Sequence, residues 1–170
     1  MPELKLNSDG RTLVSFILNG KPVSGLAEPR MLLTDFLRQV IGITDVHVGC
    51  EHGICGACTV RIDGEPARSC LTFAVQVEGR KIDTAQGLIG AKGELNDLQN
   101  AFRKHHSLQC GYCTTGILMS TTAFLEKNPN PNEDEIRDML SGHICRCTGY
   151  VGMVRAIKEV VKNRNTKTTA

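Results

Sequence analysis

The sequence predicts an α+β protein with two domains, a small sheet domain followed by a helical bundle. Two hairpin signals, Asn19-Gly20 and Asp63-Gly64, lie in the first half, and both residues of each pair tolerate the positive φ that a tight hairpin needs. The second half instead carries four amphipathic segments with helical spacing. Strand signals followed by helix signals are typical of an α+β chain or of separate domains.

The first half indicates strands around one helix. Val14, Phe16 and Leu18 alternate with other residues, which predicts a strand with one apolar face at Thr12–Leu18. A return strand follows the first hairpin turn, and a helix follows that strand. Two further strands come after a glycine-rich loop at Val48–Ala57. The expected ranges are Lys21–Leu26 for the return strand, Met31–Ile41 for the helix, and Thr59–Ile62 and Lys81–Thr84 for the later strands.

Four short helices are expected in the second half. Each is too short to be stable alone, so they should pack together as a four-helix bundle. Asn132 with Glu135 resembles a capping box that opens the third helix, and Pro129 ends the second. The expected ranges are Leu95–His105, Thr114–Lys127, the capping box to about Ser141, and Tyr150–Asn163.

These elements divide the chain into three parts. We expect a sheet domain at residues 1–88, a helical domain at 89–163 and a flexible polar tail at 164–170. The boundary should fall in the glycine-containing stretch Gly87–Gly93.

Composition and charge argue against several classes of function. The 170 residues carry a net charge of +2, which argues against a nucleic-acid binder that depends on phosphate contacts. No apolar run approaches the roughly 20 residues of a membrane helix, and Met1–Gly10 lacks the apolar stretch of a secretory signal. We therefore expect a cytoplasmic protein without a membrane segment. In that reducing compartment disulfides rarely persist, so eight cysteines point to metal binding or catalysis.

The first four cysteines have the spacing of an iron–sulfur loop. Four residues separate Cys50 from Cys55, two separate Cys55 from Cys58, and Cys70 follows later. That four-then-two spacing with a distant fourth cysteine is typical of plant-type ferredoxins, which hold a 2Fe–2S cluster. Glycines in the loop allow the sharp turns that three thiolates around a compact cluster require. Zinc also takes four thiolates and remains the alternative at this point.

The second four cysteines form two tight pairs, each just before a predicted helix. Cys110 and Cys113 precede the second helix, and Cys145 and Cys147 precede the fourth. Helix N-termini present unpaired N–H groups and a positive dipole end, which suit an anionic four-thiolate site. We expect a second metal site here, with iron–sulfur and zinc both open on the spacing alone.

Three motifs together resemble a known family. GCEHGICGACTV at 49–60, QCGYC at 109–113 and CRCTGY at 145–150 are similar to those of the small iron–sulfur subunit of the molybdenum hydroxylases, the xanthine oxidase family. The resemblance runs from about Leu13 to Val161. It implies a ferredoxin-like β-grasp domain followed by a four-helix domain, each with one 2Fe–2S cluster. It implies a large partner subunit with molybdopterin cytosine dinucleotide, and in many members a medium subunit with FAD.

The resemblance also implies an electron route. Electrons from the molybdenum centre in the partner would pass through the helical-domain cluster, then through the ferredoxin-like cluster, to FAD or another acceptor. Gln109 and Cys147 are implied to lie beside the pterin. No catalytic residue is expected in this chain, because the substrate chemistry belongs to the partner.

Two other functions are weighed against this electron-transfer subunit. The first is a free-standing two-cluster electron carrier, for which the helical half would be unnecessary. The second is a structural zinc-binding interaction module, which would be colourless. The five histidines are not expected to be ligands, because eight cysteines already fill two four-ligand sites.

Overall fold

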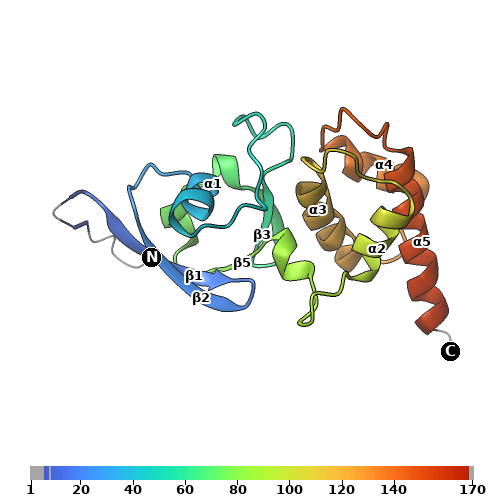
Figure 1. Cartoon of the computed structure of the whole chain (residues 1–170), viewed down its shortest axis with the longest axis horizontal. Helices are drawn as coiled ribbons and strands as arrows, with labels where there is room; N and C mark the ends of the chain where they lie inside the picture. Colours follow the sequence, from blue (N-terminus) through green and yellow to red (C-terminus); the bar gives the residue numbers. More distant parts are fainter. Residues whose placement is uncertain (1–5, 8, 169–170) are drawn as a thin grey trace.

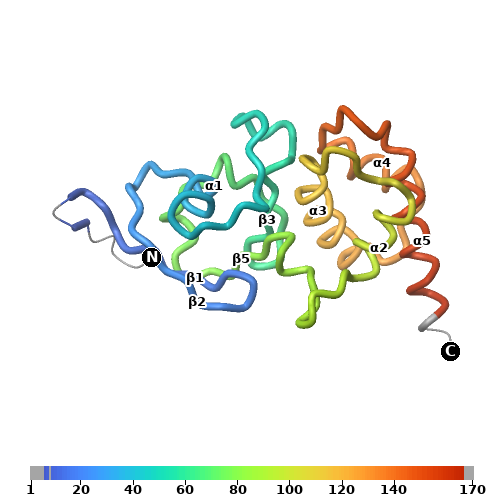
Figure 2. Tube along the Cα trace, viewed as in Figure 1, coloured from blue at the N-terminus to red at the C-terminus, as the bar shows by residue number. Residues whose placement is uncertain are grey.

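The computed structural model describes residues 6, 7 and 9–168, arranged as two halves that lie side by side (Figure 1). The first half holds all the strands, and the second holds helices α2 to α5. The chain passes between the halves through a yellow-green segment that contains η4 (Ala85–Leu88), as Figure 2 shows. Part of the expected N-terminal stretch, residues 1–5 and 8, lies outside the described residues.

The sheet has five strands in the order β2-β1-β5-β3-β4. β1 and β5 are parallel, and the other neighbours are antiparallel. The strands are β1 (Thr12–Leu18), β2 (Lys21–Ala27), β3 (Thr59–Ile62), β4 (Glu65–Arg68) and β5 (Lys81–Asp83). Val14, Phe16 and Leu18 are buried, whereas Leu13 is 58% exposed, so the predicted alternation of β1 is confirmed.

Both predicted hairpin turns are present. Asn19 and Gly20 have φ of 49° and 79°, and Asp63 and Gly64 have φ of 52° and 88°. Positive φ at both central residues is the signature of the two-residue turn that matches the twist of antiparallel strands. These turns fix the register of β1 against β2 and of β3 against β4.

The helix expected at Met31–Ile41 is shorter and wound differently. It begins with α1 (Leu33–Asp35) and continues as the π-helix η1 (Phe36–Val40), with a hydrogen bond of 3.0 Å from the Ile41 amide to the Phe36 carbonyl. It begins late because Met31 and Leu33 bond to the backbone of residues 72–74 instead of to a helical turn. Leu33, Phe36 and Leu37 are fully buried and cover the sheet.

The helical half follows the prediction closely. α2 (Asp97–Lys104) begins after Leu95, since Asn96 forms a capping box with Gln99. α3 (Thr114–Lys127) has the predicted bounds, and α4 (Glu133–Ser141) opens on the predicted Asn132–Glu135 box. None of the described helices is long and apolar enough to cross a bilayer.

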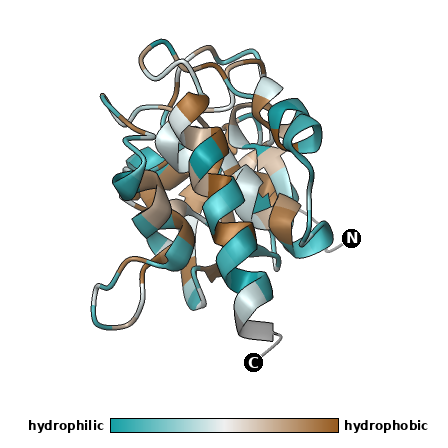
Figure 3. Cartoon of the chain, turned by 90° about the vertical axis from the view of Figure 1, so that its right-hand side faces the viewer, coloured by the Kyte–Doolittle hydropathy of each residue, from teal (hydrophilic) through white to brown (hydrophobic). Residues whose placement is uncertain are grey.

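α5 (Val151–Thr168) runs past residue 163, where the sequence predicts the last helix to end. In this last part of the helix Arg164 binds Asp97 of α2 in an ion pair of 2.7 Å, and Asn165 bonds to Asn130. Residues 169–170 lie outside the described part. Figure 3 looks onto α5 and shows mainly hydrophilic residues on its outward side. Its buried side carries Met153, Ala156, Ile157 and Val160.

Each half has its own apolar core. Phe16, Phe36 and Ile82 belong to the first, and Phe102, Ile117 and Ile157 to the second. Cys58 and Cys70 lie in the first core and Cys113 in the second. The cysteines are therefore divided between the two halves as the sequence grouping predicted.

Candidate metal centres

The first cysteine group lies on the loop before β3 and on the short helix η2 (Ser69–Leu71) that follows β4. The loop turns sharply because Glu51, Gly53 and Gly56 adopt φ of 54°, 75° and 78°. Gly49 is required for space, since a Cβ there would lie 2.9 Å from Cys55 Sγ. The loop backbone can therefore turn closely around a metal group bound by its cysteine sulfurs.

The strongest thiol–thiol interactions of this group form two pairs, although Cys70 also lies near enough to Cys50 to interact with it. Amide hydrogen bonds from Cys55 (3.3 Å) and His52 (3.4 Å) to Cys50 Sγ lower the pKa of Cys50 to about 6, and the Cys50 thiol also interacts with that of Cys55. Burial, reinforced by the neighbouring Cys58 thiol, raises the pKa of Cys70 to about 11. The pairs are thus Cys50 with Cys55, and Cys58 with Cys70.

The second group also forms two pairs. Cys113 is the N-cap of α3, and the predicted helix N-terminus is confirmed there. Burial, reinforced by the Cys145 thiol, raises the pKa of Cys113 to about 12. The Cys147 and Cys110 sulfurs lie 3.5 Å apart, and Cys110 is exposed. Bound metal cations supply the positive charge that stabilises buried thiolates.

Tyr150 holds the loop that carries Cys145. Its hydroxyl accepts a hydrogen bond of 2.7 Å from the Cys145 amide and donates one of 2.9 Å to the His143 carbonyl. Burial opposes ionisation of Cys145, but hydrogen bonds from the Thr148 hydroxyl and from the amides of Cys147 and Thr148 outweigh it and lower the pKa of Cys145. Tyr150 belongs to the CRCTGY motif, but the spacing of that motif gave no sign of this supporting role.

Replacement of Tyr150 by phenylalanine is expected to loosen the helical-domain site. The Cys145 amide loses its acceptor, and a supporting partner of a metal ligand typically contributes roughly 10- to 100-fold to metal affinity. Iron release to a chelator, followed by visible absorbance, should accelerate for one of two kinetic phases. Tyr112→Phe is the matched control, because its hydroxyl donates to the Val48 carbonyl at the other loop. Equal acceleration in both variants would contradict the assignment.

The two residues implied to lie beside a pterin are neighbours. Gln109 is exposed, and its Nε2 donates a hydrogen bond of 3.0 Å to the Cys147 carbonyl. Together with the exposed Cys110, they form one open edge of the helical-domain site.

The two cysteine loops touch each other. The Ile144 amide donates a hydrogen bond of 3.0 Å to the Cys55 carbonyl, and Ile144 is covalently joined to Cys145. The ring of His47 stacks on Tyr112 with centroids 4.7 Å apart. His143 is buried against Ser120, and a Cβ on Gly56 would lie 2.3 Å from its Nδ1. Figure 1 shows both loops along the upper edge of the molecule.

These sulfurs fit a two-iron cluster. A 2Fe–2S cluster takes four cysteine thiolates over two irons, so thiols in two pairs match its ligand demand. Within the described residues, no group of three or more His, Cys, Asp or Glu side chains is arranged to hold a single metal ion.

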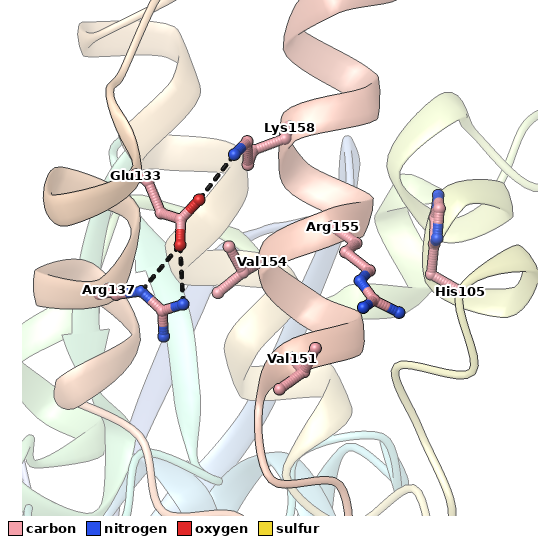
Figure 4. Close-up of a pocket in the computed structure, with 7 residues that line it drawn as sticks. All are labelled: His105, Glu133, Arg137, Val151, Val154, Arg155 and Lys158. Atoms are coloured by element: carbon pink, nitrogen blue, oxygen red, sulfur yellow. Dashed lines mark hydrogen bonds and ion pairs between the residues drawn. The ribbon is translucent and has the colours of Figure 1, made fainter.

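A separate hollow of about 450 Å³ lies between α4 and α5 (Figure 4). Lys158 and Arg137 both bind Glu133 there, at 2.6 and 2.7 Å, and their hydrogen bonds lower the pKa of Glu133 to about 2. Val151 and Val154 are its apolar lining residues, and none of its lining residues is a cysteine.

Comparison with known proteins decides between iron and zinc. Residues 16–89 match the 2Fe-2S iron-sulfur cluster binding domain, and residues 84–158 match the [2Fe-2S] binding domain. The chain is 48% identical to caffeine dehydrogenase subunit gamma of Pseudomonas sp. (strain CBB1), over 87% of this chain and 90% of that one. It is 45% identical to the nicotine 6-hydroxylase small subunit of Paenarthrobacter nicotinovorans, over 91% and 94%. The chain belongs to the small iron–sulfur subunits of the molybdenum hydroxylases.

A solved structure agrees with this membership. Quinoline 2-oxidoreductase from Pseudomonas putida 86 contains a chain with a TM-score of 0.88 and 48% identity, covering 92% of this chain and 98% of that one. The fold is therefore the predicted one, a ferredoxin-like sheet domain followed by a helical 2Fe–2S domain. This iron–sulfur subunit transfers electrons within a multi-subunit molybdenum hydroxylase, and the zinc alternative is set aside.

Proposed function

We propose that the eight cysteines of this iron–sulfur subunit hold two 2Fe–2S clusters, with one sulfur pair on each iron. The pairwise contact of the thiols carries the proposal, since it matches two ligands for each of two irons. The ligand pairs are Cys50 with Cys55 and Cys58 with Cys70 in the sheet domain, and Cys110 with Cys147 and Cys113 with Cys145 in the helical domain.

The chain's own residues provide a short connection between the two sites. When bound, such clusters supply one-electron redox chemistry. The hydrogen bond from the Ile144 amide to the Cys55 carbonyl joins a proposed ligand of one site to the residue beside Cys145, a proposed ligand of the other. This connection supports electron relay within the subunit.

We propose that electrons enter at the helical domain. A large partner subunit with molybdopterin cytosine dinucleotide would lie against Gln109 and Cys147, whose edge of the site is open. Electrons would leave from the sheet domain to a medium subunit with FAD or to another acceptor. Two apolar side chains near that site are available to such a partner, since Ile54 is 65% and Leu71 is 61% exposed.

We also propose a domain boundary and a compartment for the subunit. We infer a boundary near residues 88 and 89, because Leu88 packs against the helical core while β5 belongs to the sheet. Cytoplasmic assembly is consistent with the free thiols of all eight cysteines.

Purification of the subunit with its neighbours tests the function. We expect a brown complex with about four irons per chain of this subunit, as two 2Fe–2S clusters require, and with molybdenum in the same peak on gel filtration. Titration with the substrate should bleach the visible iron–sulfur bands without added reductant. A brown subunit that elutes alone and never with a molybdenum-containing partner would instead support the free-standing electron carrier.

A further inference from the structure

Arg68, at the end of β4, reaches across the contact between the two domains. Its Nε donates a hydrogen bond of 3.3 Å to the Gly53 carbonyl in the first cysteine loop. Its Nη2 donates one of 2.6 Å to the Gly142 carbonyl, which follows α4 in the helical domain. Its Nη1 bonds to the Thr59 hydroxyl, which in turn donates to the Gly56 carbonyl at 2.6 Å. One guanidinium thus holds both loops.

The two carbonyls that Arg68 binds flank the direct link between the loops. Gly53 lies two residues before Cys55, and Gly142 lies two residues before Ile144. The Cys55 carbonyl and the Ile144 amide form the hydrogen bond that joins the loops. Because arginine donates from a rigid planar fork, it fixes the spacing of its acceptors better than a flexible ammonium can.

We propose that Arg68 is a positioning residue that sets the Cys55–Ile144 contact and, through it, the relative placement of the two iron–sulfur sites. The inference rests on the proposed function, because it takes the eight cysteines as cluster ligands. The hydrogen bonds from the Arg68 guanidinium go to oxygen atoms of Gly53, Thr59 and Gly142 and not to a proposed ligand sulfur, so its effect passes through the loop backbone.

A variant of Arg61 can show whether an effect of Arg68 comes from its contacts with the cysteine loops or only from holding the two domains together. It also spans the two halves, from β3 to Glu126 of α3, with two hydrogen bonds of 3.0 and 2.5 Å. Its side chain is only 13% exposed. Its remaining bond goes to Gly64 in the hairpin turn, so it binds neither cysteine loop. Arg61→Met is therefore the matched control for Arg68→Met, because it also removes an arginine that bridges the two domains.

The test compares Arg68→Met, Arg68→Lys and Arg61→Met in the purified complex by two measurements. Hydrogen exchange by mass spectrometry reports protection of the peptide containing Ile144. We expect protection to fall roughly tenfold in both Arg68 variants, because a hydrogen bond to a charged group has a net effect of that order. Low-temperature EPR of the fully reduced complex reports the spin–spin splitting between the clusters, and we expect it to change in the same variants. Arg61→Met should leave both readouts as in the wild type.

Three results would overturn the proposal. An unchanged splitting in Arg68→Met, with both cluster signals present, would show that the arginine does not set the spacing. An equal change in Arg61→Met would assign the effect to domain attachment in general. A change in Arg68→Met without one in Arg68→Lys would assign it to charge instead of the planar fork. Failure of the proposed function is distinct, since the wild-type complex would then lack two cluster signals.

Discussion

Cys113→Ser is expected to remove one of the two iron–sulfur EPR signals of the reduced complex, and Cys55→Ser the other. Cys113 is buried at the start of α3 and pairs with Cys145, whereas Cys55 lies on the first loop and pairs with Cys50. Since four cysteines hold each 2Fe–2S cluster, loss of one ligand should disturb one cluster and lower the iron content by up to about half. Quantitative EPR with iron analysis measures both effects.

Each of these two variants is the control for the other. Both remove one thiol, and both positions lie close to the interdomain contact, so a general loss of folding would affect them alike. Loss of the same signal in both variants would show that the two groups of four are wrongly drawn. Survival of both signals in Cys113→Ser would show that Cys113 is not a ligand.

Gly116→Val is expected to cause a large loss of stability, because Gly116 of α3 lies directly on the first cysteine loop. A Cβ at Gly116 would lie 2.1 Å from the Gly56 carbonyl oxygen, a backbone atom that cannot rotate away. Overpacking of this kind costs about 1–3 kcal/mol and sometimes more. Because Gly56 lies between Cys55 and Cys58, its displacement should also weaken the sheet-domain cluster. The midpoint of urea unfolding and the EPR signal lost by Cys55→Ser are the measurements.

Gly142→Ala provides the matched control at the same interdomain contact. A Cβ there would meet its nearest neighbours, Arg68 Nη2 and the Met139 carbonyl, at 3.5 Å, which is ordinary van der Waals contact. Its backbone carbonyl, and with it the bond from Arg68, is retained. The prediction fails if the two substitutions lower the urea midpoint equally.

Local sequence patterns were sufficient for elements that depend on local interactions. The hairpin turns at Asn19-Gly20 and Asp63-Gly64 and the capping box at Asn132 depend on residues within four positions of one another. The cysteine spacings predicted the two groups for the same reason. The pairing of Cys110 with Cys147, by contrast, depends on how the loop before α3 and the loop before α5 meet.

Local sequence patterns do not predict contacts between segments that are distant in the chain. The helix formed by α1 and η1 begins at Leu33 and not at Met31 because the Leu33 amide bonds to the Thr72 carbonyl, and no periodicity of residues 31–41 indicates that contact. Arg68 was missed because its acceptors lie 15 and 74 positions away in the chain. The sequence does not predict that α5 continues past residue 163, because its polar residues give no sign of the ion pair between Arg164 and Asp97.

The division into two cores implies an order of events during synthesis. All five strands lie within residues 12–83, and domains generally fold as units with the N-terminal one first. The sheet domain can therefore close its core while α3 to α5 are still on the ribosome. Ile144 and Gly142 reach the first cysteine loop only after α4 has been translated. Until then that loop is uncovered on the side that the helical domain later occupies.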